Sequence, residues 1–384
     1  MLNKFHNDQY SFCATYYHVL AVFSILFFKE PILDSVKIHN GSSFRRSKNS
    51  NIERSWVSLN RLPILAVDVG YKKVKYVSHQ HEGIFNAVIA PEKTVMSDTY
   101  SAVTKSTPII VDGTAYWFGK DALYQPTAVT SAKNQRMTTE LAKVLVAAAA
   151  WESSLEGDIF LSTGLPLDLF KDEQAITEKA WLGQQLTIEK GGTRRKIHIK
   201  AVELLPQGIA ALLYALSLKT IAEKWPTSGL VTLIDLGERT TDVATVRADT
   251  LEPIRGLCFS IEVGVRDLKQ QILRIAKQEL PLIPEFMADD LLKTGTGIYR
   301  RQRYDFTQVR RDSIEQFAHQ IVGELQTRFA ASDSLIALAL LAGGGAEVLG
   351  ETISRIYDAE VIEEPTMANV LAYYQKAAAQ KFFS

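Results

Sequence analysis

The feature that most constrains this chain is a short pattern that occurs twice. An apolar run ends in Asp-x-Gly, and a second run with alternating apolar residues follows it. The first copy is LPILAVDVG at 62–70, followed by YKKVKYVSH, and the second is LIDLGERTTDVATV at 233–246. Alternation with a period of two predicts strands, so each copy predicts a β-hairpin. One such turn is common, but two predict an internal repeat and a pair of α/β domains.

Both predicted turns have the chemistry of a phosphate site. Glycine has no side chain to hold a ligand away, so backbone N–H groups at an Asp-x-Gly turn can approach phosphate oxygens. Asp68 and Asp235 stand at these turns. Carboxylates repel phosphate unless a divalent cation or its waters lie between them, which implies Mg²⁺. Two facing turns would therefore form a clamp for a metal-bound phosphate.

A third glycine cluster follows the apolar run of IALALLAGGGAEVLGETI at 336–353. It predicts a strand that ends at Gly343, Gly344 and Gly345, followed by a helix that starts near Glu347. Consecutive glycines let the ribose and phosphates of a ligand lie on the backbone; tight packing between strand and helix is the alternative. The chain contains no G-x-x-x-x-G-K-[ST] loop and no G-x-G-x-x-G after a strand, which disfavours P-loop and Rossmann folds.

In this order the three motifs resemble the superfamily of actin, heat-shock chaperones and sugar kinases. Within it, the chain is most similar to the ParM/StbA family of plasmid-segregating bacterial actins. Three further stretches carry that resemblance: STGLPLDLF at 162–170, ELLPQGIAALLYAL at 203–216 and PTMANVLAYY at 365–374. The resemblance covers residues 63–384. It implies an actin-like (ribonuclease H-like) two-domain α/β fold with nucleotide in the inter-domain cleft.

The resemblance also implies roles for individual residues. Asp68 and Asp235 would hold Mg²⁺ through water, and Asp235 would alternatively polarise the nucleophile. Gln207 would orient the attacking water, and its amide is too weak a base to give fast hydrolysis. Asp242 suits a structural contact on the second strand as well as a ligand contact. The other residues that the resemblance places at the nucleotide are Gly70, Lys75, Gly237, Thr240, Thr241, Gly343, Gly344, Gly345 and Glu347.

Both turns depart from the family pattern. The first turn often carries small residues, whereas this chain has Tyr71, Lys72 and Lys73. The lysines would replace hydroxyl groups as phosphate ligands. In the second turn Glu238 replaces a common glycine, and Arg239 follows it. These five residues are expected at the cofactor site, with Glu238 facing solvent or the metal.

The resemblance divides the chain into parts. Domain I is expected over 63–228, with a subdomain insertion over about 86–135, and domain II over 229–345. Helices over 346–384 would return to domain I. Residues 1–62 read as an extension with three explanations: a start assigned too far upstream, a disordered linker, or a membrane anchor at 12–28, which is almost wholly apolar.

Composition argues against direct nucleic-acid binding and for a cytoplasmic protein. The 43 Lys and Arg residues balance 43 Asp and Glu residues, so no global field attracts DNA or an anionic membrane. Only Cys13 and Cys258 occur, which is typical of a reducing compartment. The arginine-rich stretch at 299–311 has adjacent acids, and we expect a salt-bridged helix surface there.

Together these features predict an ATPase that uses ATP or GTP with Mg²⁺ and polymerises into nucleotide-dependent filaments. Its partners would be other copies of itself and a DNA-binding adaptor on a plasmid centromere-like site. Two alternatives remain open: a non-polymerising or membrane-linked actin-like scaffold, and a small-molecule kinase of the same superfamily. A kinase would need an aspartate that activates a substrate hydroxyl, and a scaffold would be favoured if residues 12–28 insert into a membrane.

Overall fold

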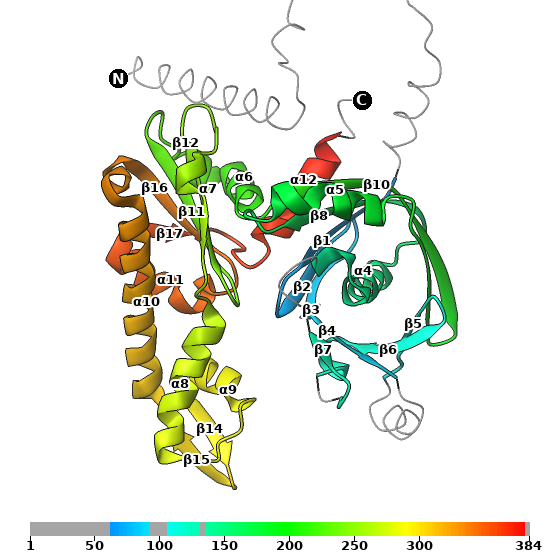
Figure 1. Cartoon of the computed structure of the whole chain (residues 1–384), viewed down its shortest axis with the longest axis horizontal. Helices are drawn as coiled ribbons and strands as arrows, with labels where there is room; N and C mark the ends of the chain where they lie inside the picture. The colour runs from blue at the N-terminus through cyan, green and yellow to red at the C-terminus, as the bar shows by residue number, and fades with distance from the viewer. Residues whose placement is uncertain (1–61, 93–105, 124, 131–135, 381–384) are drawn as a thin grey trace, which may run out of the picture.

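The chain folds into two lobes, each built on its own β-sheet (Figure 1). This computed structural model describes residues 62–92, 106–123, 125–130 and 136–380. The apolar stretch at 12–28 lies outside the described residues, and so does the extension over 1–62 apart from its last residue.

The first lobe contains a ten-stranded sheet in the order β3-β2-β1-β8-β10-β9-β5-β6-β4-β7. β1 is antiparallel to β2 and parallel to β8, and β8 is parallel to β10. The strands are β1 (Ile64–Val69), β2 (Lys73–Val77), β3 (Glu82–Asn86), β4 (Val88–Pro91), β5 (Ile109–Val111), β6 (Thr114–Phe118), β7 (Val129–Thr130), β8 (Gly157–Leu165), β9 (Gln185–Lys190) and β10 (Thr193–Pro206).

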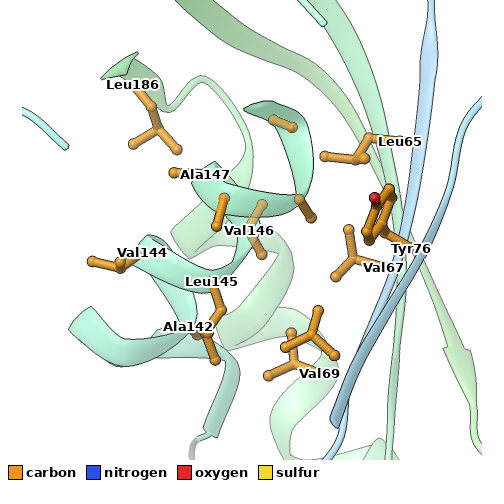
Figure 2. Packing of buried hydrophobic residues seen from close by; sticks show 14 of the residues in the cluster. Leu65, Val67, Val69, Tyr76, Ala142, Val144, Leu145, Val146, Ala147 and Leu186 are labelled. Atoms are coloured by element: carbon orange, nitrogen blue, oxygen red, sulfur yellow. The ribbon is translucent and has the colours of Figure 1, made fainter. Parts of the chain in front are cut away.

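This sheet curls around a buried helix, α4 (Glu140–Glu152) (Figure 1). The short strands β4 to β7 join the same sheet through β5, which pairs with β9, so they extend it and enclose the helix. α4 is apolar on nearly all sides, as a fully enclosed helix must be. Figure 2 shows Leu65, Val67 and Val69 of β1 packed beside it. Its run of small residues, Ala147–Ala150, is fully buried and permits this close approach.

The second lobe repeats the strand order of the first. Its five-stranded sheet runs β13-β12-β11-β16-β17, with β11 antiparallel to β12 and parallel to β16. This order and these directions match β3-β2-β1-β8-β10, so the predicted duplication and two-domain α/β fold are confirmed. The strands are β11 (Leu230–Leu236), β12 (Thr241–Arg247), β13 (Phe259–Ile261), β16 (Ile336–Ala342) and β17 (Ala359–Val361).

Helices cover the sheets and join the lobes. α6 and α12 share one apolar core with residues of both sheets, including Ala66 of β1 and Leu233 of β11. α12 also contacts β1 and β8, so the C-terminal part of the chain returns to the first lobe. The α-helices that follow α4 in the chain are α5 (Phe170–Trp181), α6 (Ile209–Ser217), α7 (Lys219–Ala222), α8 (Val265–Glu279), α9 (Met287–Thr294), α10 (Thr307–Phe329), α11 (Ala346–Tyr357) and α12 (Ala368–Gln380).

The arginine-rich stretch at 299–311 differs from the expected helix surface. β14 (Thr296–Tyr299) and β15 (Gln302–Asp305) form a separate hairpin, and only the residues from Thr307 onward are helical. Arg300 and Arg301 form its tight turn with positive φ angles of 48° and 67°. The expected helix surface over 299–305 was wrong: the alternation of Tyr, Arg and Gln fits short strands, and the helical pattern begins only after them.

Within the described ranges, none of the helices combines the length and apolar character that crossing a membrane requires.

The return of α12 depends on a glycine in β8. A methyl group at Gly164 would run into the buried ring of Tyr373 and would lie 2.9 Å from the carbonyl oxygen of Leu205. We expect Gly164→Ala to lower the free energy of unfolding by about 1–3 kcal/mol, because neither neighbour can move freely. Urea denaturation measures this change.

The matched control is Gly323→Ala in the middle of α10, where an added methyl meets open space. This substitution should stabilise the protein by up to about 1 kcal/mol, because alanine favours the helix. Equal effects of the two substitutions would contradict the packing of α12 against β8.

Candidate functional site

The first Asp-x-Gly turn connects β1 to β2 and needs its glycine. The amide N–H of Gly70 donates to the carbonyl oxygen of Lys73 over 3.0 Å, which closes the turn. A Cβ atom at Gly70 would lie 2.7 Å from that oxygen, too close for any other residue. The turn therefore presents bare backbone at the end of β1.

Asp68 lies buried at the base of this turn and is held on both oxygens. The residue is 3% exposed and lies in a strand that is otherwise apolar. Lys75, opposite it in the β1–β2 ladder, donates to Oδ2 over 2.8 Å. Gln207, which follows β10, donates to Oδ1 over 3.0 Å. The predicted metal-site aspartate, phosphate lysine and water-orienting glutamine therefore lie together.

The second turn, between β11 and β12, has the same geometry. The amide of Gly237 donates to the carbonyl oxygen of Thr240 over 2.9 Å, and a Cβ at Gly237 would lie 2.7 Å from that oxygen. The Thr241 hydroxyl is buried and donates to the carbonyl oxygen of Val263, so it anchors the turn to its own lobe. The Thr240 hydroxyl donates to Asp242 over 3.0 Å.

Asp235 occupies the position in the second turn that Asp68 occupies in the first, but its surroundings are opposite in charge. Its partner across the ladder is Asp242, where the first turn has Lys75. Burial, and then the negative charge of Asp242, raise the pKa of Asp235 to about 6, although Lys75 and a hydrogen bond from Asn369 act against the increase. Asp242 itself accepts hydrogen bonds from Thr240 and Ser260.

Asn369 in α12 connects the two halves of the site. Its Nδ2 donates to Asp235 over 2.7 Å, and its Oδ1 accepts from the amide of Gly208 over 3.1 Å. Gly208 directly follows Gln207, whose side chain donates to Asp68, so three hydrogen bonds and one peptide linkage connect the two aspartates. The sequence analysis did not single out Asn369. The only sign of its role in the sequence is that a polar amide stands at the start of the otherwise largely apolar stretch that forms α12.

The third glycine cluster lies against Asp235. A Cβ at Gly343, which has φ of +82°, would collide with the Asp235 carboxylate and lie 2.6 Å from the carbonyl oxygen of Leu236. A Cβ at Gly345 would lie 2.8 Å from the Leu236 side chain. Gly344 differs, because a Cβ there would approach only the Thr366 hydroxyl, at 3.9 Å. The packing alternative therefore explains Gly343 and Gly345 but leaves Gly344 unexplained.

The other residues expected at the cofactor have protein partners. Lys73 donates to Asn86, Lys72 pairs with Asp289 on α9, and Glu238 pairs with Lys269 on α8. Arg239 stacks on Tyr71 with its guanidinium 4.5 Å from the ring centroid. Glu347, in the first turn of α11, accepts from Thr366 over 2.7 Å. Of these three lysines, Lys75 is thus the one that donates a hydrogen bond to the Asp68 carboxylate, whereas Lys72 and Lys73 have other partners.

The donor set fits a hydrated magnesium ion rather than a protein cage. Mg²⁺ keeps several waters and is bound by one or two carboxylates together with substrate phosphates. Asp68 and Asp235 supply two carboxylates, one from each lobe. In the part of the chain that the structure describes, no group of three or more His, Cys, Asp or Glu side chains could hold a metal ion alone.

A cavity of about 490 Å³ lies elsewhere, between α8 and α10. Gln270, Arg274 and Lys277 line it from α8, and Phe317 lines it from α10. The cavity contains none of the residues expected at the cofactor.

The raised pKa of Asp235 predicts the pH dependence of stability in the protein without nucleotide and metal. Its ordinary pKa is 3.8, so the folded state holds this proton more tightly than the unfolded state. Stability from this group is therefore lost as the pH rises from about 4 to about 6. Asp235→Asn avoids the loss, and we expect it to be about 1–3 kcal/mol more stable than the parent at pH 8.

The measurement is urea denaturation at pH 4 and pH 8 without nucleotide. The advantage of Asp235→Asn should shrink toward zero at pH 4, where the aspartate is protonated in the folded protein. The same advantage at both pH values, or none at pH 8, would contradict the assigned environment of Asp235.

The two lobes match models of actin-like proteins. The N-terminal domain of actin-like proteins matches residues 66–209, and the C-terminal domain of the MreB-like archaeal actin homologues matches residues 233–355. Archaeal actin homologs of Thermoplasma volcanium and Thermoplasma acidophilum are each 28% identical over 329 residues, covering 82% of this chain and 98% of theirs.

Solved structures agree with this relationship. A crystal structure of an archaeal actin homolog aligns with a TM-score of 0.74 at 26% identity, covering 83% of this chain and all of the homolog. Its complex with ADP aligns with a TM-score of 0.72 at 25% identity, covering 83% of this chain and all of the homolog. A 15-stranded ParM filament protein from Clostridium botulinum shares the fold, with a TM-score of 0.71 at 19% identity. The chain is thus similar to actin-like proteins in both lobes, its sequence relatives here are archaeal actin homologs, and the expected ParM/StbA type is not confirmed.

Proposed function

We propose that this protein binds ATP or GTP with Mg²⁺ between its two Asp-x-Gly turns, hydrolyses it, and assembles into filaments in a nucleotide-dependent way. The observation that carries the proposal is the pair Asp68 and Asp235. They occupy equivalent strand ends in duplicated lobes and are joined through Gln207, Gly208 and Asn369. A structural role alone would not require two buried carboxylates at the point where the lobes meet.

The chain's own groups would divide the work. Lys75 and the amides of the two turns would bind phosphate oxygens, and the carboxylates would hold the hydrated metal ion, which neutralises phosphate charge when bound. Gln207 is already oriented by its hydrogen bond to Asp68. In that position its amide would orient a water for attack without removing a proton efficiently, which suits slow hydrolysis.

The comparisons support nucleotide binding and self-association. An archaeal actin homolog of this fold has been crystallised with ADP, and a ParM protein of this fold forms a filament of 15 strands. Loss of the terminal phosphate would release one lobe from the other and change the surfaces that neighbouring subunits contact. Nucleotide state would then control assembly.

We further propose that the filament moves plasmid DNA in the cytoplasm through an adaptor protein. This part of the proposal rests on the resemblance of the sequence motifs to the ParM/StbA family. The balanced charge of the chain argues that a separate protein makes the DNA contact. Capture of DNA by the filament alone, without any second protein, would contradict this part.

Gly344 offers a test of nucleotide binding that is separate from folding. An added methyl meets open space apart from one ordinary van der Waals contact, 3.9 Å from the Thr366 hydroxyl, so Gly344→Ala should leave the unfolding temperature of the nucleotide-free protein unchanged. If the nucleotide lies on this backbone, the methyl should weaken ATP binding about tenfold or more, or ~1.4 kcal/mol. Calorimetric titration measures the affinity.

Gly256→Ala is the matched control, because a methyl there also meets open space and lies outside the proposed site. It should leave both affinity and stability unchanged. Unaltered ATP affinity in Gly344→Ala would contradict the position assigned to the nucleotide.

Light scattering and phosphate release, recorded together after addition of ATP and Mg²⁺, test assembly and hydrolysis. Scattering should rise and then decay as phosphate is released. Gln207→Ala should assemble but release phosphate roughly 100-fold more slowly, because the water loses its orienting group. Its filaments should therefore persist.

Binding or hydrolysis without scattering, over a wide range of protein concentrations, would contradict polymerisation and favour the scaffold. Phosphate transfer that depends on an added hydroxyl substrate would favour the kinase. Membrane fractionation completes the comparison, since sedimentation with membranes would support a membrane-linked scaffold.

A further inference from the structure

Four charged side chains form a chain of ion pairs between the two turns. Lys72 of the first turn donates to Oδ1 of Asp289 on α9 over 2.5 Å. The same oxygen lies 3.3 Å from the ammonium of Lys269 on α8. Lys269 in turn pairs with Glu238 of the second turn. Asp289 thus contacts both lysines through a single carboxylate oxygen.

This arrangement joins an exposed pair to a buried ammonium: the side chains of Lys72 and Asp289 are 37% and 58% exposed. Lys269 is only 6% exposed, and a buried ammonium is stable only beside anionic partners. Burial acts to lower the pKa of Lys72, yet the hydrogen bond that Lys72 donates to Asp289 and the charge of Glu238 hold that pKa above its ordinary value. Burial likewise acts against ionisation of Asp289, and the two lysines hold its pKa below the ordinary value.

A second contact connects the same two turns. The guanidinium of Arg239 lies 4.5 Å from the centroid of the Tyr71 ring, a cation–π distance. Tyr71 and Lys72 are consecutive in the first turn, as Glu238 and Arg239 are in the second. Each turn therefore uses two neighbouring side chains to hold the other lobe. Three of these residues, Tyr71, Lys72 and Glu238, stand at positions where the sequence departs from the small residues of the family pattern.

We propose that Asp289 is a positioning residue that holds the two turns together through Lys72 and Lys269 and thereby slows the release of bound nucleotide. The inference rests on the proposed nucleotide site. A nucleotide between the turns leaves only when the lobes separate, and separation breaks the contact of Asp289 with Lys72. Closure of this protein is therefore supported by its own side chains and not by nucleotide alone.

The test compares Asp289→Asn with Asp290→Asn in the full chain. Both aspartates lie in the first turn of α9, so either change removes the same favourable interaction with the helix N-terminus. Asp289→Asn also removes the charge between the lysines. Release of a fluorescent ADP analogue, measured by stopped flow, should be about three- to tenfold faster in Asp289→Asn and unchanged in Asp290→Asn. Asp289→Glu should restore slow release.

Unchanged or slower release in Asp289→Asn would overturn the proposal, and so would equal acceleration in both variants. A nucleotide-free measurement separates this result from failure of the proposed function. Hydrogen exchange at the amides of the first turn should be faster in Asp289→Asn than in Asp290→Asn without any ligand. If the parent binds no nucleotide, the proposed function fails, while faster exchange would still show that Asp289 holds the turns.

Discussion

The structure depends on burying two carboxylates, Asp68 and Asp235, at the same position in two copies of one sheet. An ionised carboxylate without partners is costly in a protein interior, so each copy must compensate it. The first copy does so with Lys75 and Gln207. The second copy opposes Asp235 with Asp242 and supplies only the neutral amide of Asn369, which leaves its pKa near 6. In the duplicated fold, the charge of Asp68 is therefore compensated by a lysine, whereas Asp235 faces a second carboxylate and has a raised pKa.

The C-terminal helix α12 supplies the side chain that donates a hydrogen bond to Asp235, the less compensated of the two aspartates. α12 reaches β1 and β8 of the first lobe and presents Asn369 to Asp235 of the second. The small residue Gly164 lets Tyr373 of this helix seat against β8. One helix thus connects apolar packing in the first lobe to the charged position in the second. A change in the ionisation or ligation of Asp235 would therefore alter its hydrogen bond with Asn369, which lies where the lobes join.

The sequence predicted the backbone framework better than the side-chain contacts. The repeated strand and Asp-x-Gly pattern depends on local spacing, and both hairpins, their glycine turns and the duplication are present. Local spacing could not reveal Asn369, which follows Asp235 by 134 positions and meets it only through the return of α12. The partners of Lys72 and Glu238 were hidden for the same reason, since Asp289 and Lys269 belong to other elements. The hairpin at 296–305 was missed because two short strands carry little periodic signal.

The proposed function requires the two turns to form a single site for a metal-bound nucleotide. Calorimetric titration of ATP into the nucleotide-free protein, with and without Mg²⁺, tests it most directly. The account predicts one nucleotide per chain and binding at least about tenfold tighter with Mg²⁺, since both carboxylates would otherwise face phosphate. The absence of binding, or an affinity that Mg²⁺ does not change, would contradict it.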